Sequence, residues 1–283
     1  MNYSDITVGI VSFKSEKVIF RCLKSIKKLK KIIIFDNSND EKLKKKINLI
    51  YPKIKFIVSK KNLGYGEANN KIIKICKTKF LFILNPDTIL EKKCEKELLD
   101  SIKYLKNNFA VISPLSKEKN YSINNFHIEK NINSLINVEY VKGFAMLVNV
   151  AQIKNIGMFD KNIFLYLEEI DLCNRLKDKN KKIYINKKSK VIHLGAKSTN
   201  LGFEFEKCRN WHWMWSSFYF YRKNNNYFLS ALKFAPTLLI NFLKFLFFSI
   251  VFNYKKKIIY YMRMTGIFNS MIGKSSWYRP KLN

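Results

Sequence analysis

The feature that most constrains the fold is a regular alternation of short apolar runs with amphipathic segments over the first hundred residues. The runs that predict strands are 6–12, 31–35, 55–58 and 80–84, and the segments that predict helices between them are 16–28, 40–50 and 66–76. Strands that alternate with helices in this way indicate βαβ units and a parallel sheet. The sequence therefore predicts an α/β domain.

The rest of the chain divides into a polar stretch, a second ordered part and an aromatic, apolar end. Residues 115–137 are Asn-rich and irregular, which predicts a loop that crosses the site as a lid. Beyond them we expect a strand at 141–148, a helix at 168–179 and two short strands within 183–193. A chain of 283 residues is long for one domain and short for two, so we expect an α/β domain over 1–205 and a helical region over 206–283.

Polar side chains follow the predicted strands at the points where the strands end. They are Ser12, the run Asp36-Asn37-Ser38, the loop from Asn62 to Gly66, and Asn85-Pro86-Asp87. In open parallel sheets ligands bind outside the carboxyl ends of the strands. We therefore expect these groups to converge on one edge of the sheet.

Two of the strand ends carry groups that suit a metal ion. Asp87 follows a buried run, where its carboxylate can meet a hard divalent cation that keeps its other positions for phosphate oxygens and water. The alternative is ordinary turn chemistry, since Asn-Pro-Asp is a common turn sequence. His193 follows the apolar pair Val191-Ile192, and its alternative is a structural histidine.

A cluster of three carboxylates begins the predicted helix at 168. Glu168, Glu169 and Asp171 fall within one helical turn, and repulsion between like charges can raise the pKa of one of them. A raised pKa suits a general base. The alternative is a solvated acidic turn that complements the helix dipole. The apolar residues at Phe159 and 163–167 favour a turn that enters from the core instead.

Charge and cysteine content limit the classes of function. The 53 Lys and Arg residues against 21 Asp and Glu give a net charge of +32, which attracts polyanions. The alternative is a Lys-rich composition of the kind that an AT-rich genome produces. Five cysteines without a C-x-x-C pair favour a reducing cytosol, and the first residues do not predict a signal peptide.

Taken in order, these segments resemble the inverting family-two glycosyltransferases of GT-A fold, in particular the rhamnosyltransferase-like branch that builds bacterial surface polysaccharides. The resemblance runs from about Thr7 to about Lys223. It is carried by VSFKSEKVIFRCLKSI, IIIFDNSND, NLGYGEANN, FLFILNPD, VKGFAMLVN, GMFDKNIFLYLEEIDLCNRL, VIHLGAKST and RNWHWMWSSFYFYRK. The fold that it implies is a Rossmann-like, mostly parallel central sheet with flanking helices, followed by a C-terminal helical extension.

The resemblance also implies an activity and a set of roles. A sugar such as rhamnose would pass from a dTDP- or UDP-linked donor to a glycan acceptor, with Mg²⁺ or Mn²⁺ as cofactor. The implied nucleotide-sugar contacts are Ser12, Asp36 (on the nucleobase), Asn62, Gly64, Asn69, Asn85 and Asp87; the implied metal ligands are Asp87 and His193; the implied acceptor region is Gly143 and Phe144. Glu169 would be the base, with Asp171 and Glu168 as alternatives, because the family more often has Asp at this position. Asn85 stands where the family's general metal motif has a first Asp.

The apolar segment 228–252 is long enough to cross a bilayer, which takes about 20 residues. Lys233, Asn241 and Lys244 interrupt it, and a lysine at the bilayer centre costs about 2.5 to 3.5 kcal/mol. We therefore expect an interfacial amphipathic helix that holds the protein peripherally on the cytoplasmic face of the membrane, near a polyprenyl-diphosphate-linked acceptor. A true span and a packed helical subdomain are the alternatives.

Two other classes of function remain as alternatives. One is a non-catalytic relative that binds a nucleotide sugar without turning it over. The other is a basic nucleic-acid-binding protein, which the charge of +32 suggests. The sequence carries no recognisable nucleic-acid recognition module, so we expect no nucleic-acid partner. It indicates no oligomeric state.

Overall fold

The computed structural model describes residues 1–116, 128–132, 134–195 and 202–279. The chain divides into two compact units. We call Met1–Asp160 with Glu169–Thr199 the sheet unit, and Lys161–Glu168 with Asn200–Asn283 the helical unit. Each unit is described by itself below.

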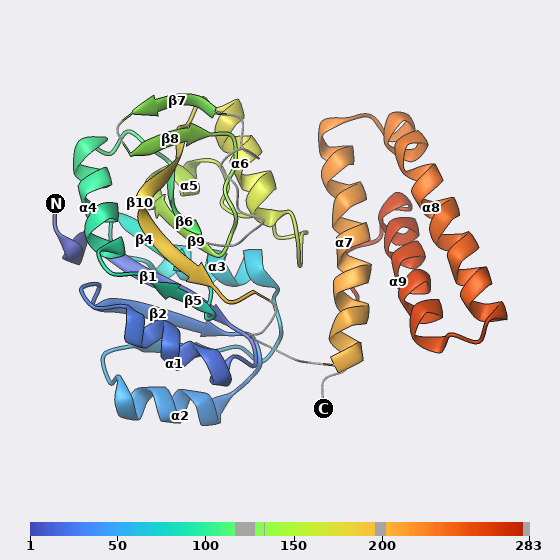
Figure 1. Ribbon diagram of the computed structural model, residues 1–283, viewed down its shortest axis with the longest axis horizontal. Helices are drawn as coiled ribbons and strands as arrows, with labels where there is room; N and C mark the ends of the chain where they lie inside the picture. Colours follow the sequence, from blue (N-terminus) through green and yellow to red (C-terminus); the bar gives the residue numbers. More distant parts are fainter. Residues whose placement is uncertain (117–127, 133, 196–201, 280–283) are drawn as a thin grey trace. The chain divides into compact units, whose positions relative to one another are not determined.

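The sheet unit is built on one ten-stranded sheet with flanking helices (Figure 1). Its strands are β1 (Ile6–Ser12), β2 (Lys31–Asp36), β3 (Lys55–Val58), β4 (Phe80–Leu84), β5 (Thr88–Leu90), β6 (Val111–Ser116), β7 (Ile128–Ile132), β8 (Leu135–Val138), β9 (Ala145–Asn149) and β10 (Ile183–His193). Its helices are α1 (Glu16–Ser25), α2 (Glu41–Ile50), α3 (Tyr65–Ile75), α4 (Cys94–Tyr104), α5 (Val150–Asn155) and α6 (Glu168–Asp178). The first residue of α6, Glu168, belongs to the helical unit, as the last residue of its segment 161–168. The strand order is β3-β2-β1-β4-β9-β6-β10-β8-β7, and β5 pairs with β10 off this path.

The first four strands of this order form the predicted parallel sheet. β2 pairs in parallel with both β1 and β3, and β1 pairs in parallel with β4. Every residue of β1 and β4 is buried, which explains their continuous apolar runs. Helix α3 approaches β1 so closely that a Cβ on Gly9 would lie 2.9 Å from Cγ2 of Ile72. Glycine at position 9 therefore permits this packing.

Beyond β4 the sheet becomes mixed. β9 runs antiparallel to both β4 and β6, and β10 pairs in parallel with β6 but antiparallel with β8 and β5. The expected parallel arrangement thus holds for the N-terminal half, and the insertion of β9 between β4 and β6 makes the complete sheet mixed. This α/β architecture confirms the predicted fold class.

Two sequence predictions about the second half were wrong in detail. Much of the expected irregular segment 115–137 is ordered, since β7 and β8 form a hairpin whose second strand pairs with β10; residues 117–127 and 133 lie outside the described chain. The two short strands expected within 183–193 are one strand, β10, with a register shift between Asn186 and Lys190. Asn186 Oδ1 accepts hydrogen bonds from the amides of Lys188 and Ser189 and so stabilises the irregularity.

The helical unit consists of α7 (Gly202–Asn224), α8 (Tyr227–Ile250) and α9 (Tyr254–Met271), together with residues 161–168 (Figure 1). Asn226 and Asn253 cap α8 and α9, because their side chains accept hydrogen bonds from the amides of Leu229 and Lys256. α9 packs closely on α7, and a Cβ on Gly266 would collide with the carbonyl oxygen of Trp211. In the part of the chain that the structure describes, α8 is the one helix long and apolar enough to cross a membrane, and only 6% of its apolar window is buried.

Candidate active site

The ends of β1 and β2 bring Ser12 and Asp36 side by side. The two residues are register partners in the parallel pair, and both are fully buried. The Asp36 carboxylate accepts hydrogen bonds from Ser38 Oγ at 2.7 Å, from the Ser38 amide at 3.0 Å and from the Asp40 amide at 2.9 Å. A carboxylate has about four acceptor positions, so Asp36 orders its own loop and keeps capacity for one further donor.

The loop after β3 is tied to the end of β2 by Asn37, which the sequence placed at this edge of the sheet without a role of its own. Its Nδ2 donates to the Gly64 carbonyl at 3.0 Å, and its Oδ1 accepts from the Leu63 amide at 3.2 Å. Asn62 Oδ1 accepts from the Gly64 amide at 3.0 Å. Gly64 has a φ of 81°, in the left-handed region that favours glycine, and it begins α3. The loops after β2 and β3 thus form one hydrogen-bonded rim.

Two buried polar atoms at this rim have no hydrogen-bond partner among the described residues. They are Ser12 Oγ and Asn69 Oδ1. The Nδ2 of Asn69 donates to the Tyr65 carbonyl at 3.0 Å, which fixes its side chain within α3. Because buried polar groups are normally satisfied, these two oxygens are places where a ligand donor fits.

The pairing of β5 with β10 brings Asp87 and His193 together. Thr88 and His193 are register partners, and the Leu194 amide donates to the Asp87 carbonyl at 3.0 Å. As a result His193 Nε2 lies 3.4 Å from Asp87 Oδ1. Asp87 is 4% exposed and the His193 side chain 16% exposed. Two residues far apart in the sequence therefore meet in one largely buried spot.

This pair fits a divalent cation as part of a ligand set. Carboxylate oxygen and imidazole nitrogen are both ligands that such ions accept in proteins. Over the described residues, no group of three or more His, Cys, Asp or Glu side chains could hold an ion. A cation on Asp87 and His193 would therefore take its remaining ligands from a substrate or from water.

The segment Gly143-Phe144 lies next to the Asp87–His193 pair. The Phe144 ring stacks on the His193 ring with centroids 4.4 Å apart and planes 14° apart. The Phe144 carbonyl accepts a hydrogen bond from the Asn85 amide at 2.8 Å. Phe144 thereby holds the end of β4 and the end of β10 in one arrangement.

The same segment also lies next to Glu169. A Cβ on Gly143 would lie 3.5 Å from the Glu169 Cβ and 3.4 Å from the Tyr65 ring, and the Tyr65 hydroxyl donates to the Gly143 carbonyl. Tyr65 is a second neighbour that the sequence did not assign to the site, although it lies within NLGYGEANN. Gly143-Phe144 thus connects the Asp87–His193 pair to Glu169.

The Glu169 carboxyl group has a raised pKa, and burial is its largest cause. Hydrogen bonds from the backbone amides of Glu169 and Gly143, and the positive charge of Lys142, act in the opposite direction. The direction agrees with the sequence prediction, but the reason differs, because desolvation and not repulsion between neighbouring carboxylates dominates. Glu169 is half-buried, and a partly desolvated carboxylate with a raised pKa is suited to accept a proton near neutral pH.

The other two carboxylates of the cluster are buried, so the solvated acidic turn considered above is wrong. Asp171 is paired with Arg175, whose Nε lies 2.9 Å and Nη2 2.8 Å from Asp171 Oδ2. Arg175 also donates to the carbonyls of Ile156 and Met158. Asp171 therefore anchors α6 to the loop after α5. Glu168, which directly precedes Glu169 in the sequence, is also buried.

A strained turn precedes these carboxylates. Tyr166 and Leu167 have φ values of 72° and 70°, which bulky side chains rarely adopt and which cost of order 1–3 kcal/mol each. Contacts within the helical unit hold the turn: Ser216 Oγ donates to the Leu165 carbonyl at 2.8 Å, and Phe164 packs on His212 at 4.6 Å between ring centroids. No local sequence pattern indicates this turn, because the contacts that hold it come from α7.

His212 has a structural role. Its ring nitrogens make hydrogen bonds with the Tyr278 carbonyl at 2.8 Å and with Ser276 Oγ at 3.0 Å. Burial lowers its pKa to about 3, so the ring stays neutral. All five cysteines are buried and free.

Comparison with known proteins agrees with this geometry. The chain matches the model of glycosyl transferase family 2 over residues 7–171. It is 24% identical over 196 residues to the low-salt glycan biosynthesis hexosyltransferase Agl10 of Haloferax volcanii, covering 62% of each chain. It is 28% identical over 214 residues to the rhamnosyltransferase WbbL of Escherichia coli K12, covering 64% of this chain and 78% of the relative. The chain thus spans less than two thirds of the hexosyltransferase.

A solved structure shows the same fold at low sequence identity. The mannosyltransferase PcManGT from Pyrobaculum calidifontis, in complex with GDP-Man and Mn²⁺, has a TM-score of 0.61 and 10% identity over 94% of this chain and 87% of its own. The family match covers more than half of the chain and extends from β1 to the first turn of α6, so it includes Asp36, Asp87 and Glu169. With its GT-A-like sheet and this match, the chain belongs to glycosyl transferase family 2.

Proposed function

We propose that this protein is an inverting, metal-dependent glycosyltransferase that moves a hexose or a deoxyhexose such as rhamnose from a nucleoside-diphosphate sugar to a hydroxyl of a glycan acceptor. One observation carries the proposal. The segment Gly143-Phe144 contacts both candidate groups, because the Phe144 ring stacks on His193 of the Asp87–His193 pair and Gly143 lies against Glu169. A diphosphate leaving group and an acceptor hydroxyl need these two kinds of group close together.

On the donor side, the rim formed by the loops after β1, β2 and β3 would hold the nucleotide. Asp36 keeps capacity for one donor, which suits the N–H of a uracil or thymine base. Asn85 follows β4 and would contact the ribose. Asp87 and His193 would hold Mg²⁺ or Mn²⁺, and the ion would neutralise charge on the departing diphosphate.

On the acceptor side, Glu169 would act as the base. Its carboxylate takes the proton from the acceptor hydroxyl as that oxygen bonds to the anomeric carbon and the bond from this carbon to the diphosphate breaks. Attack from the face opposite the leaving group inverts the anomeric configuration in one step. The hydrogen bond from the Gly143 amide orients the carboxylate, and burial keeps its pKa high enough to accept the proton.

The decisive experiment is turnover of a panel of nucleotide sugars with Mg²⁺ or Mn²⁺. The relatives named above are a rhamnosyltransferase and a hexosyltransferase, and the similar structure was solved with GDP-Man and Mn²⁺, so the panel contains dTDP-rhamnose, UDP-hexoses and GDP-mannose. Asp87→Ala should abolish turnover without unfolding the protein. Asp100→Ala, which removes an exposed carboxylate paired with Lys96 on α4, is the matched control. Unchanged turnover in Asp87→Ala would remove the assigned metal role.

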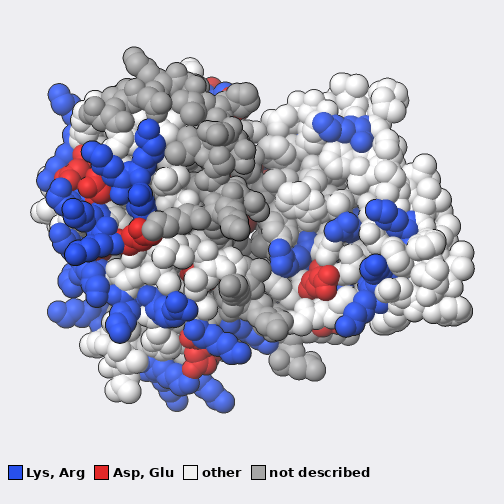
Figure 2. All heavy atoms as spheres, viewed as in Figure 1, with Lys and Arg blue, Asp and Glu red and all other residues white. Residues whose placement is uncertain are grey.

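A non-catalytic nucleotide-sugar-binding protein is the second candidate. It would bind a donor from the same panel and release neither sugar nor nucleoside diphosphate. A nucleic-acid-binding role has less support: in Figure 2 the basic side chains are spread over the sheet unit with acidic side chains among them. Donor hydrolysis separates the first two candidates directly.

We further propose that the helical unit holds the protein peripherally on the cytoplasmic face of the cell membrane, where it meets a lipid-linked acceptor used for surface polysaccharide such as lipopolysaccharide. Residues 207–283 contain 13 Lys and Arg residues and no Asp or Glu. Large apolar side chains of α8 are exposed along its length: Phe228, Leu232, Leu239, Leu243, Phe247 and Ile250. Such a basic and apolar surface suits anionic lipid.

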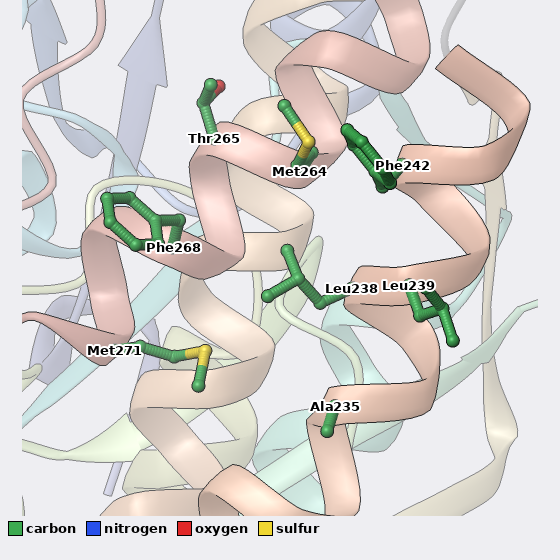
Figure 3. A pocket seen from close by; sticks show the side chains of 8 residues that line it. All are labelled: Ala235, Leu238, Leu239, Phe242, Met264, Thr265, Phe268 and Met271. Carbon is green, nitrogen blue, oxygen red and sulfur yellow. The ribbon is translucent and has the colours of Figure 1, made fainter. Parts of the chain in front are cut away.

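An apolar groove between α8 and α9 adds to this surface (Figure 3). It has a volume of about 430 Å³ and is lined by Ala235, Leu238, Leu239, Phe242, Met264, Thr265, Phe268 and Met271. The only hydroxyl in this lining, that of Thr265, donates within its own helix to the Tyr261 carbonyl. Flotation with vesicles containing phosphatidylglycerol tests the contact. Release by high salt or alkaline carbonate is expected, and retention after carbonate would indicate a true span instead.

A further inference from the structure

A polar pocket lies within the helical unit, and the donor chemistry above does not use it. It has a volume of about 470 Å³ and is lined by Tyr166, Glu206, Arg209, Asn210, Trp213 and Arg263. The residues come from the strained turn, from α7 and from α9. Arg209 and Trp213 belong to the aromatic motif RNWHWMWSSFYFYRK, for which the donor site has no role.

Each of the two arginines in this pocket is held by a hydrogen bond from its own Nε. Arg209 Nε donates to the Tyr166 hydroxyl at 2.6 Å, and Arg263 Nε donates to Asn210 Oδ1 at 2.6 Å. Within the described chain, no acceptor engages the terminal Nη groups of either side chain. A guanidinium group anchored in this way is pre-organised to bind phosphate oxygens through its remaining N–H groups.

The rest of the lining suits a ligand that is anionic at one point and apolar beside it. Trp213 is 46% exposed and packs edge-on against the Tyr166 ring at 5.5 Å. The lining contains one carboxylate, Glu206, and the two guanidinium groups of Arg209 and Arg263, so the pocket carries a net positive charge. α8 of the same unit presents the exposed apolar residues described above. Phosphate, aromatic and lipid contacts are therefore available in one unit.

The chain itself limits how far this pocket can be from the base. Tyr166 lines the pocket, and Glu169 follows three residues later. Three residues span at most about 11 Å even when fully extended. The Cα atoms of Tyr166 and Glu169 are therefore no more than about 11 Å apart.

We propose that this pocket binds the diphosphate group of a lipid-linked acceptor, with Arg209 and Arg263 on the phosphate oxygens and Trp213 against the adjoining part of the lipid. The proposal rests on the proposed transfer to a lipid-linked acceptor. It assigns acceptor recognition to the helical unit and donor recognition to the sheet unit. It also explains why Arg209 holds Tyr166, since the pocket wall and the turn before the base are then one structure.

The test is binding of farnesyl diphosphate to the full-length protein in EDTA, which keeps a divalent ion from the donor site. Titration calorimetry should show binding, inorganic pyrophosphate should compete, and farnesol, which lacks the diphosphate, should bind at least about tenfold more weakly. Arg209→Gln and Arg263→Gln should each weaken binding about tenfold or more. Arg222→Gln is the matched control, because Arg222 is exposed on the same helix as Arg209 and lies over the Tyr227 ring; its affinity should stay within about twofold.

Equal affinity of the two variants and the control for farnesyl diphosphate would overturn the proposal. So would variants that lose binding to phosphatidylglycerol vesicles while keeping wild-type affinity for farnesyl diphosphate, because the arginines would then serve the membrane surface. Thermal unfolding identifies a variant that does not fold; Arg263→Lys then replaces it, with weaker binding expected from the loss of the planar fork. Failure of pyrophosphate to compete in the wild-type protein overturns the proposal without any variant.

The same samples separate this proposal from the proposed function. Asp87→Ala should bind farnesyl diphosphate as the wild type does and should lose turnover of the donor. Persistent donor turnover in Asp87→Ala would contradict the proposed function and leave the measurement of the pocket intact. Loss of farnesyl diphosphate affinity in Asp87→Ala would instead place the diphosphate at the donor site and contradict the pocket.

Discussion

Replacing Glu169 by glutamine tests the proposed base most directly, because the side chain keeps its shape and loses its ability to take a proton. The structure provides one carboxylate beside Gly143 with a raised pKa, while Asp171 is committed to Arg175. A positioned general base contributes about 100- to 10,000-fold to a rate. Glu169→Gln should therefore lower kcat by about this factor, equivalent to about 3 to 5 kcal/mol of activation free energy. Donor binding should be unchanged.

The assay is transfer at saturating donor, measured over a range of pH, with Asp171→Asn as the comparison. In the wild type the active form of Glu169 is the carboxylate, so kcat/KM should rise with pH through its pKa, above the ordinary value of about 4.3. This rise of kcat/KM on the acid side of the pH profile, the acid limb, should disappear in Glu169→Gln. In Asp171→Asn the limb should remain, and the loss should be mainly in stability, because Arg175 would lose its partner.

The same substitution has a predicted sign for stability. The folded pKa of Glu169 is raised, so ionisation disfavours the folded state, and the wild type loses stability as pH rises from the unfolded pKa through the folded one. Glu169→Gln avoids this loss, by about 1.4 kcal/mol for each unit by which the two pKa values differ. Its midpoint of thermal unfolding should exceed that of the wild type at about pH 8, and the two should converge below about pH 4. A variant with wild-type kcat and no stability gain would refute the assignment of Glu169.

Three further predictions concern other parts of the site and the fold. His193→Ala should raise the Mn²⁺ concentration needed for half-maximal turnover about 10- to 100-fold, and EDTA should abolish wild-type turnover, whereas a metal titration identical to that of the wild type would exclude His193 as a ligand. Lys142→Met removes a positive charge that lowers the pKa of Glu169, so the acid limb of kcat/KM should move to higher pH; a limb that stays or moves lower contradicts this. Gly266→Ala should destabilise the protein by about 1 to 3 kcal/mol, because the new methyl group meets the Trp211 carbonyl; an unchanged thermal midpoint would show that α7 and α9 can separate freely.

The parallel part of the sheet could be predicted from the sequence, because its strands are short apolar runs between polar residues. β1, β3 and β4 have the predicted ends, since each is a short apolar run bounded by polar residues. β7 and β8 could not be predicted in the same way, because they lie in an Asn-rich stretch and their order comes from pairing with β10. Local pattern thus failed where tertiary pairing determines the structure.

The candidate site shows the same division. Asp36, Asp87 and Glu169 follow recognisable strand or helix signals, and their positions could be read from the sequence. The element that brings Asp87 to His193 is β5, a strand of three residues that is too short to leave a pattern. The burial that raises the pKa of Glu169 is likewise invisible in a sequence, where only the neighbouring carboxylates can be seen.

One of the boundaries between the two units falls on the peptide bond between Glu168 and Glu169. The residues before this bond are ordered by α7 and its neighbours, and the residue after it is ordered by the sheet unit. A chain shortened to end before α7 would keep the loops proposed to hold a nucleotide but would lose the contacts that maintain the unfavourable backbone of Tyr166 and Leu167. If Glu169 is the base, such a fragment should still bind a donor and transfer nothing, and the C-terminal helices would then serve catalysis as well as the proposed membrane contact.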